Sequence, residues 1–216
     1  MTTLRTDTPR AKPVHAMQPS GREIPGNRTF TFFREFFRSP RLLGTCFPCS
    51  KQVAAAMTDG IGLETAMSVA EFGPGTGAIT PSILERINPD AVYFAIERND
   101  VMAAAFRARF PQVTLHEDDA RNIRTIMRGE GVEKLDIIVS ALPWLIFPEE
   151  VREPMLTEAV AALKPGGIFS QITYFADSLP AAKKFRRLME RHFSEIRAVR
   201  RVWRNLPPAF VYHCVK

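Results

Sequence analysis

Three glycines stand two residues apart in Glu71-Phe-Gly73-Pro-Gly75-Thr-Gly77, directly after an apolar, strand-like stretch. Glycine lets the backbone turn sharply and approach a ligand closely. The spacing G-x-G-x-G differs from the G-x-G-x-x-G of dinucleotide-binding turns. The motif is weak evidence by itself, because any tight turn between a strand and a helix can have this composition. Glu71 adds an acid at the end of the preceding strand.

Two further acids follow the next strand-like stretches. Glu97 ends AVYFAIE, where a carboxylate can accept hydrogen bonds from ribose hydroxyl groups, and Asp119 lies in Glu117-Asp-Asp-Ala120 after the third stretch. A single acid at a strand end is as often a surface residue as a ligand. In a parallel sheet, however, ligands bind outside the carboxyl ends of the strands. The sequence therefore predicts one binding edge that carries all three acids.

The elements that must position these residues alternate regularly from residue 68 onward. Apolar, β-rich stretches alternate with helical ones, and this pattern favours an α/β fold with a Rossmann-like, doubly wound, mostly parallel sheet of seven strands. The last two strand-like runs, EIRAVRRVW and AFVYHCV, are separated by only a few residues. That linker is too short for a crossover helix, so an antiparallel hairpin is expected at the sheet edge. Helices are also expected over residues 50–59 and 180–192.

Composition limits the partners and the compartment. The length of 216 residues suits one α/β domain with a short extension, and the net charge of +6 fits a polyanionic partner such as nucleic acid or an anionic bilayer. No apolar run is long enough to span a bilayer and no secretory leader is visible, so a cytoplasmic protein is expected. Cys46 and Cys49 form a C-x-x-C pair without the context of a redox or zinc site, and the four histidines show no metal-ligand spacing. No metal is expected.

The N-terminal segment has a different composition from the rest. Residues 1–50 carry eight bases and three acids, or 8 − 3 = +5 of the total charge of +6. Residues 1–26 are polar and contain prolines and glycines, which predicts a flexible tail. Residues 27–44 predict an amphipathic helix, because five phenylalanines fall within an arc of about 160° when placed at 100° per residue.

This helix has arginines on its polar side, the pattern of a helix that lies in a membrane interface. The alternative is a helix that packs its apolar side on its own domain, and a lid over the active site could do both. The residues predicted to contact the membrane are Phe30, Phe33, Phe36, Phe37, Arg34 and Arg38.

The motif E-F-G-P-G-T-G and the spaced acids make residues 45–216 resemble the methyltransferase domain of the class I S-adenosylmethionine-dependent methyltransferases. The resemblance implies S-adenosyl-L-methionine as cofactor and S-adenosyl-L-homocysteine as product. It also implies that the glycines wrap the amino-acid end of the cofactor, that Glu71 lies near its amino group and that Glu97 holds the ribose. Asp119 and the backbone of Ala120 would meet the adenine. The full set that it implies for the cofactor is Glu71, Gly73, Gly75, Gly77, Glu97, Arg98, Asp119, Ala120 and Ser140.

The stretch Ser140-Ala-Leu-Pro-Trp144 helps to choose among these enzymes. Its place resembles the N-L-P-Y loop of the rRNA adenine dimethyltransferases, but the asparagine position is Ala141, which has no amide to accept a hydrogen bond from a base. Those enzymes also carry an additional C-terminal helical domain, whereas this sequence ends at its last strand. An rRNA adenine N6-methyltransferase is therefore the alternative, and a cofactor-binding regulator on the same fold is a third interpretation.

The sequence resembles the bacterial phospholipid N-methyltransferases more closely than it resembles the rRNA enzymes. The matching features are the phenylalanine-rich segment, L-G-T-C-F-P-C-S at residues 43–50, the glycine motif and S-A-L-P-W. The resemblance implies stepwise methylation of phosphatidylethanolamine towards phosphatidylcholine by a peripheral protein on the inner face of the cell membrane. The partners implied are an anionic membrane surface and a phospholipid substrate. Nucleic acid is not expected as a partner. The protein is expected to be a monomer.

The chemistry of this reaction suggests the remaining site residues. An amine with a pKa near 10 must lose a proton before it attacks, and a desolvating site can lower that pKa without a strong base. Ser140, Trp144 and Tyr174 are the predicted catalytic residues. Both aromatic rings could hold a quaternary ammonium by cation–π contact, or could simply fill a packed core. Arg204 is predicted to bind the lipid phosphate. His116 is interpreted as structural or as a neighbour of the cofactor.

Overall fold

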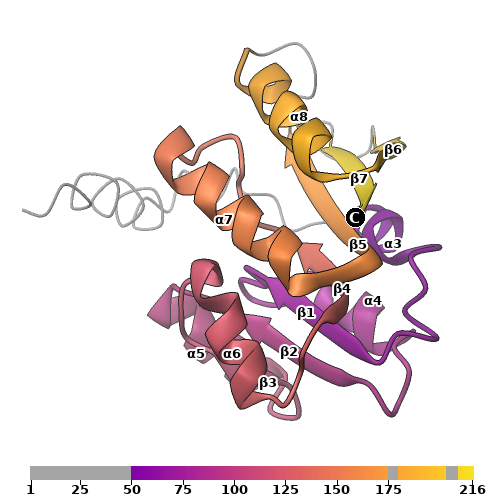
Figure 1. Ribbon diagram of the computed structural model, residues 1–216. Coiled ribbons are helices and arrows are strands. Elements are labelled where there is room, and N and C mark those ends of the chain that lie inside the picture. The colour runs from indigo at the N-terminus through magenta and orange to yellow at the C-terminus, as the bar shows by residue number, and fades with distance from the viewer. Residues whose placement is uncertain (1–49, 175–179, 203–208) are drawn as a thin grey trace, which may run out of the picture.

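The computed structural model describes residues 50–174, 180–202 and 209–216, and within them seven strands form one sheet (Figure 1). The strand order is β3-β2-β1-β4-β5-β7-β6. The strands are β1 (Ser68–Phe72), β2 (Val92–Ile96), β3 (Thr114–His116), β4 (Leu135–Ser140), β5 (Leu163–Tyr174), β6 (Glu195–Val202) and β7 (Ala209–Val215).

The direction of the strands follows the sequence pattern. The neighbours β1–β2, β1–β4, β2–β3 and β4–β5 are parallel. Between consecutive parallel strands of the chain, helices return it to the opposite end of the sheet. β7 runs antiparallel to both β5 and β6. The predicted doubly wound α/β sheet with an antiparallel hairpin at its edge is therefore confirmed.

The helices are α3 (Lys51–Thr58), α4 (Thr80–Leu84), α5 (Asp100–Arg109), η1 (Ala120–Asn122), α6 (Ile123–Gly129), α7 (Glu149–Ala162) and α8 (Pro180–His192). Several begin at a polar side chain that caps free backbone N–H groups. The Ser50 hydroxyl accepts from the N–H of Val53 at 3.3 Å, and the Asn99 side chain accepts from the N–H of Met102 at 2.9 Å. The helices expected over residues 50–59 and 180–192 are thus present as α3 and α8.

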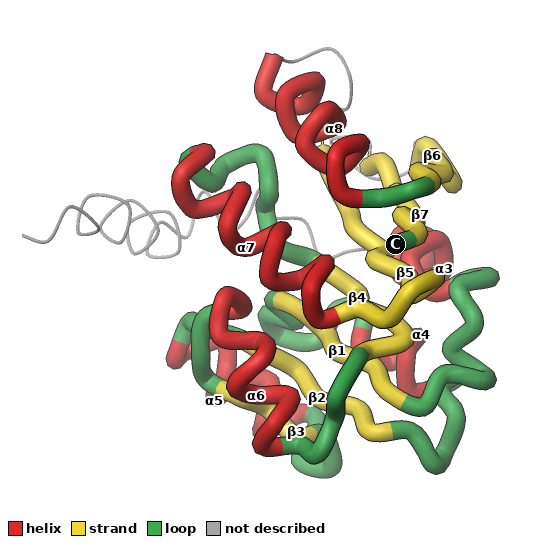
Figure 2. Tube along the Cα trace, viewed as in Figure 1, coloured by secondary structure: helices red, strands yellow, loops and turns green. Residues whose placement is uncertain are grey.

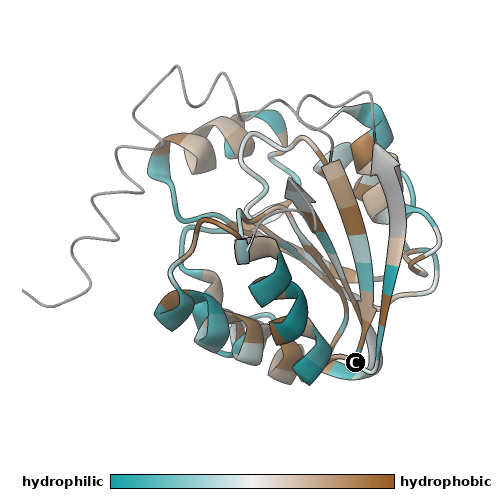
Figure 3. Ribbon diagram, turned by 90° about the horizontal axis from the view of Figure 1, so that it is seen from above, coloured by the Kyte–Doolittle hydropathy of each residue, from teal (hydrophilic) through white to brown (hydrophobic). Residues whose placement is uncertain are grey.

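Helices cover both faces of the sheet (Figure 2). Because side chains alternate along a strand, Ala70 and Phe72 pack with residues of α6, α7 and α8, whereas Val69 packs with residues of α3 and α4. α5 packs through Phe106 against Ala95 of β2. Colouring by hydropathy shows hydrophilic and hydrophobic residues on the same helices, as expected for helices with one side on a sheet (Figure 3).

Part of the predictions falls outside the described residues. These are the flexible tail over 1–26, the amphipathic helix over 27–44 with its six membrane-contact residues, the Cys46–Cys49 pair and Arg204. None of the helices in the described part of the chain has the length and apolar composition needed to cross a bilayer.

Candidate active site

The carboxyl ends of the parallel strands meet at one edge of the sheet. The N–H of Gly73 donates to the carbonyl of Ile96 at 2.9 Å, and the N–H of Glu97 donates to the carbonyl of His116 at 3.0 Å. On the other side of β1, the N–H of Ala141 donates to the carbonyl of Phe72 at 2.9 Å. The loops that leave β1, β2, β3 and β4 are therefore tied together at the edge where the sequence predicts the ligand.

The three glycines of the motif are required for different reasons. All have positive φ, +64° at Gly73, +58° at Gly75 and +81° at Gly77, a region that other residues rarely adopt. A Cβ atom at Gly77 would overlap the ring of Phe110, and one at Gly73 would lie 2.7 Å from a methyl group of Leu142. At Gly75 no atom lies within 4 Å of that position. The middle glycine therefore has open space against its backbone, unlike Gly73 and Gly77.

Glu71 is fully buried beneath this turn. Its Oε2 accepts hydrogen bonds from the Thr80 hydroxyl at 2.9 Å and the Tyr93 hydroxyl at 2.6 Å. Burial raises the pKa of Glu71 to about 7, although both hydrogen bonds act in the opposite direction. Oε1 has no hydrogen-bond partner among the described residues. Glu71 thus links β1 to α4 and β2 under the glycines, a role that its position in the motif does not reveal.

Glu97 contacts the glycine turn directly. Its Oε2 accepts from the N–H of Gly75 at 3.1 Å and its Oε1 accepts from the N–H of Asn99 at 2.8 Å. The side chain is 9% exposed, and burial raises its pKa despite these backbone hydrogen bonds. The acid at the end of β2 therefore lies beside the open position at Gly75, as the shared edge predicts.

Asp119 contacts two arginines, Arg98 and Arg121, at the same edge. Oδ2 contacts Nη1 of Arg98 at 3.0 Å, and Oδ1 accepts from Nε of Arg121 at 2.9 Å. Burial alone would raise the pKa of Asp119, but the hydrogen bonds and charge of Arg121, with the charge of Arg98, outweigh burial and lower it. Asp119 also caps η1, whose first residue is the buried Ala120. The carboxylate is thus held ionised at the start of this turn.

The loop after β4 is fixed by one buried hydrogen bond. Nε1 of Trp144 donates to the hydroxyl of Ser140 at 2.9 Å, and both side chains are almost fully buried. The indole ring stacks on Phe185 at 5.5 Å and meets the edges of Phe169 and Phe147. Trp144 is 1% exposed, so no ring face is open to a cation. The prediction of a cation–π contact at Trp144 is wrong in this arrangement, and the packing interpretation holds because three phenylalanines enclose the ring.

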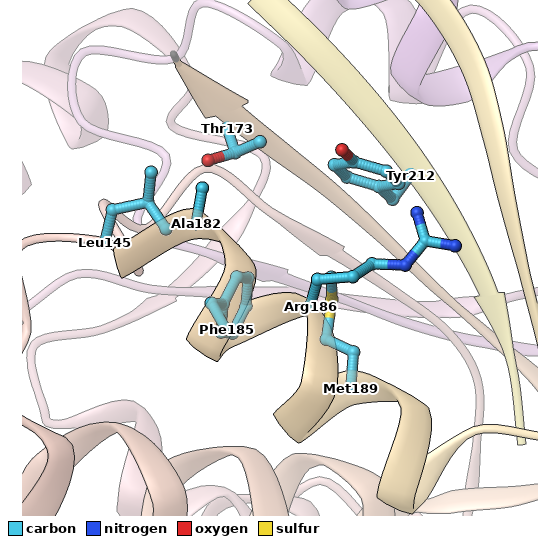
Figure 4. Close-up of a pocket in the computed structure, with 7 residues that line it drawn as sticks. All are labelled: Leu145, Thr173, Ala182, Phe185, Arg186, Met189 and Tyr212. Atoms are coloured by element: carbon cyan, nitrogen blue, oxygen red, sulfur yellow. The ribbon is translucent and has the colours of Figure 1, made fainter. Parts of the chain in front are cut away.

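A small cavity lies near the packed Trp144 side chain (Figure 4). It encloses about 10 Å³, enough for roughly one water molecule and too little for a substituted ammonium group. The guanidinium of Arg186 lies 5.5 Å from the ring centroid of Tyr212 at its side. The lining residues come from the loop after β4, from β5, from β7 and from α8, and they are Leu145, Thr173, Ala182, Phe185, Arg186, Met189 and Tyr212.

The remaining predicted residues have simpler positions. His116 lies within 2.8 Å of an oxygen of Glu130 and packs edge-on against Phe94, which agrees with a structural role. Tyr174 ends β5, but its side chain lies outside the described residues, as does Arg204. The motif search missed Tyr93 and Thr80. Thr80 had a sequence signal, since a threonine followed by proline opens the helix after the glycine turn.

A doubly wound sheet with this strand order, a glycine turn after β1 and acids after β2 and β3 defines the class I S-adenosylmethionine-dependent methyltransferases. Residues 69–167 match the family model described as a methyltransferase domain. The chain is also similar to a solved structure, the 1,6-didemethyltoxoflavin-N1-methyltransferase from Burkholderia thailandensis with bound S-adenosylhomocysteine. The TM-score is 0.65 at 17% identity, over 94% of this chain and 93% of that one.

Two curated relatives narrow the class. The chain is 33% identical to an ornithine lipid N-methyltransferase from Singulisphaera acidiphila over 86% of this chain and 94% of that protein. It is 32% identical to the ribosomal RNA small subunit methyltransferase A from Acidobacterium capsulatum, over 50% of this chain and only 38% of that protein. The chain belongs to the bacterial lipid N-methyltransferase family within class I.

The cofactor of this family is S-adenosyl-L-methionine, and the described residues fit it. The open position at Gly75 leaves space for a ligand against the backbone. Glu97 supplies a carboxylate beside that position, suited to ribose hydroxyl groups, and Asp119 with Ala120 stands at the end of the next strand. The residues that would hold the cofactor therefore lie on the three adjacent loops after β1, β2 and β3.

Proposed function

We propose that this protein transfers methyl groups to the headgroup amine of phosphatidylethanolamine, and then to its mono- and dimethyl intermediates, towards phosphatidylcholine at a membrane surface. The observation that carries the proposal is the relationship to a lipid N-methyltransferase over nearly the whole length of that protein. The loop after β4 adds to it. Ala141 stands where the RNA enzymes have an asparagine, so the loop offers no side-chain acceptor to a base amine at this position.

The choice of lipid rests on chemistry that two headgroups share. The relative is named for ornithine lipid, and an ornithine headgroup, like ethanolamine, presents a primary amine. The two differ in the neighbouring anion, a carboxylate in one and a phosphate diester in the other. The resemblance of S-A-L-P-W and of residues 43–50 to phospholipid enzymes supports phosphatidylethanolamine.

The residues of the chain have three tasks in this reaction. Bound S-adenosylmethionine supplies an electrophilic methyl group on a sulfonium. Gly75 and Glu97 position the cofactor, and the Ser140–Trp144 hydrogen bond fixes the loop that faces it. Leu142 and Leu145 make this loop apolar, which favours the neutral form of an incoming amine and so lowers its pKa. No dedicated base is then required, and alignment of the amine with the methyl group supplies much of the rate.

The same edge carries exposed apolar side chains. Val101, in the first turn of α5 after β2, is 70% exposed, and Ile146, in the loop after β4, is 39% exposed. Both lie beyond the carboxyl ends of their strands, on the side where the cofactor binds. Met67 and Val92, at the amino end of the strands, are exposed as well, so the membrane contact is assigned mainly to the amphipathic helix predicted over residues 27–44. On this proposal the enzyme is a monomer that binds peripherally to an anionic inner membrane surface.

The decisive experiment is incubation of the full chain with methyl-labelled S-adenosylmethionine and three acceptors, each tested separately. These are vesicles that contain phosphatidylethanolamine, vesicles that contain ornithine lipid, and ribosomal RNA. Thin-layer separation should show label in mono-, di- and trimethylated phosphatidylethanolamine. Label only in ornithine lipid would overturn the phospholipid assignment while keeping a lipid enzyme. Label only in RNA would establish the alternative, an rRNA adenine N6-methyltransferase.

A second experiment tests whether the N-terminal segment with the predicted amphipathic helix binds the membrane. Removal of residues 1–38 should abolish binding to vesicles that contain anionic lipid while the domain keeps its thermal unfolding transition. The binding of the full chain should strengthen with anionic lipid and weaken with salt, because screening reduces the attraction of exposed charges. Vesicle binding by the truncated protein equal to that of the full chain would refute the role assigned to the amphipathic helix.

A further inference from the structure

A charged cleft lies between α7 and α8, which run side by side on one face of the sheet (Figure 1). Its volume is about 130 Å³, against about 10 Å³ for the cavity near Trp144. Seven residues line it, namely Glu149, Arg152 and Glu153 from α7 and Lys184, Arg187, Leu188 and Arg191 from α8. None of them belongs to the cofactor site described above.

The charges in this cleft do not balance. Four bases and two acids line it, a formal difference of 4 − 2 = +2. Arg191 pairs with Glu153 at 2.8 Å, and Lys184 lies 4.0 Å from Glu149. These contacts use both acids of the cleft. Arg152 and Arg187 have no carboxylate partner in the part of the chain that the structure describes.

Arg152 is the unusual member of the set. It is only 6% exposed, and its Nε atom is buried without a hydrogen-bond partner among the described residues. Its guanidinium carbon lies 5.9 Å from the ring centroid of Phe185, a contact that does not replace the missing acceptor. A guanidinium keeps its charge when it is buried. A buried cation without a carboxylate partner is costly, and an anion from outside the chain would offset that cost.

We propose that the cleft between α7 and α8 binds a phosphate group, with Arg152 as its buried ligand and Arg187 at the rim. A phosphate presents several acceptor oxygens, so it can engage two guanidinium groups at once and offset their unpaired charge. Two sources carry this group, an anionic phospholipid and a soluble phosphate ester. The proposal does not depend on which lipid accepts the methyl group.

Thermal unfolding of the full chain tests the proposal, in chloride and in inorganic phosphate at equal pH and ionic strength. Phosphate at ten times its Kd should raise the Tm of the wild type by roughly 4 °C, because a ligand that binds only the folded state stabilises it. Arg152→Met keeps an unbranched stem against Phe185 but removes the charge. It should show no phosphate-dependent shift, and its Tm in chloride should equal or exceed that of the wild type, because a desolvated cation is gone.

The matched control is Arg128→Met, which removes one positive charge from an exposed residue of α6. This variant should keep the full phosphate-dependent shift. Arg187→Met gives an independent reading at the exposed rim, where folding is not at risk, and should weaken phosphate binding by roughly fivefold. A wild-type Tm that does not respond to phosphate, or an equal response in Arg152→Met, would overturn the proposal.

Binding to vesicles then shows whether the phosphate group comes from a lipid or from a soluble ester. Phosphatidylglycerol carries a phosphate but no amine, so it cannot be a methyl acceptor. If the source is a lipid, Arg152→Met should bind phosphatidylglycerol vesicles about tenfold more weakly than Arg128→Met does. If the source is soluble, both variants bind vesicles equally, and glycerol 3-phosphate stabilises the wild type but not Arg152→Met. Either result supports a phosphate site, and the absence of both effects refutes it.

Discussion

The two halves of the sheet present different kinds of site at the same edge. After β1, β2 and β3, buried or half-buried acids are held by backbone N–H groups, hydroxyls and arginines, and the glycine turn contributes no side chains. After β4, the loop is held by aromatic packing around Trp144 and one hydrogen bond. On the proposed function the first region is the cofactor half, with a fixed backbone and hydrogen-bonded acids. The second region is the acceptor half, with a buried tryptophan under an apolar loop.

This difference suggests how one fold serves many substrates. A backbone cradle such as that at Gly75 cannot change without strain, because its shape depends on positive φ and on close contacts at Gly73 and Gly77. The loop after β4 rests on side chains, and its shape can change when they do. We expect substitutions in the two halves to separate stability, cofactor affinity and acceptor turnover. The predictions below test that separation from the largest effect to the smallest.

The largest effect is expected at Trp144. Trp144→Ala should lower the free energy of unfolding by about 4 kcal/mol, because it removes a buried ring that three phenylalanines enclose and leaves a cavity. Urea unfolding measures the change. Cofactor affinity, measured by calorimetry on the folded fraction, should stay within about twofold of the wild-type value. A cofactor affinity that falls together with stability would show that the two halves are not independent.

Substitutions at two glycines of the motif should affect stability and cofactor affinity differently. Gly77→Ala should lower the free energy of unfolding by about 3 kcal/mol, since it combines a strained φ with an overlap against Phe110. Gly75→Ala meets no atom within 4 Å, so only the strained φ destabilises it, by about 1 kcal/mol. Its added methyl group should instead reduce cofactor affinity by roughly tenfold. Equal losses of affinity in both variants would contradict the assignment of the open position to the cofactor.

Sequence reasoning succeeded where a local signal reports a global arrangement. The alternation of strands and helices, the short linker before β7 and the glycine spacing predicted the sheet, its edge hairpin and the glycine turn. Acids at the ends of β2 and β3 were found because parallel strands bring their carboxyl ends to one edge. The family resemblance, in turn, was confirmed by the lipid N-methyltransferase relative.

Sequence reasoning failed where the deciding contact is distant in the chain. The burial of Trp144 depends on Phe169 and Phe185, which no local pattern pairs with it. The position of Glu71 under the turn depends on Tyr93, 22 residues away. The burial of Arg152 has no local signal in the sequence, because it is a property of the packed helices α7 and α8.

The pH dependence of stability should carry the signature of Glu71. Because its folded-state pKa is raised to about 7 from an ordinary value of 4.5, the folded state holds the proton more tightly than the unfolded state. The contribution of Glu71 to stability is therefore present at low pH and is lost as pH rises towards 7. It should fall by about 2 kcal/mol between pH 5 and pH 7.

Glu71→Gln should remove this slope, and urea unfolding of both proteins across that pH range measures the difference between them. The hydrogen bonds from Thr80 and Tyr93 have an acceptor in either side chain, so the comparison isolates the proton. Glu97→Gln is the matched variant at a less buried acid and should flatten the slope less. An unchanged slope in Glu71→Gln would mean that Glu71 is ionised throughout.

The smallest effect is expected from Ser140→Ala. The substitution leaves the indole N–H of Trp144 without its acceptor in a dry core, and should lower the free energy of unfolding by about 1 kcal/mol. Trp144→Phe provides the control, because phenylalanine has no N–H to satisfy. In the Trp144→Phe background, Ser140→Ala should therefore change stability by less than about 0.5 kcal/mol, and the cycle gives the coupling of the two side chains.

The same cycle decides what Ser140 does in catalysis. If Ser140 only positions the loop through Trp144, Ser140→Ala should lower kcat for the lipid acceptor severalfold, and the effect should disappear in the Trp144→Phe background. The KM for the cofactor should not change, because the contact lies in the acceptor half. A loss of kcat that persists without the indole would assign the hydroxyl a direct contact with a substrate. That outcome would also end the separation between a cofactor half built on polar contacts and an acceptor half built on packing.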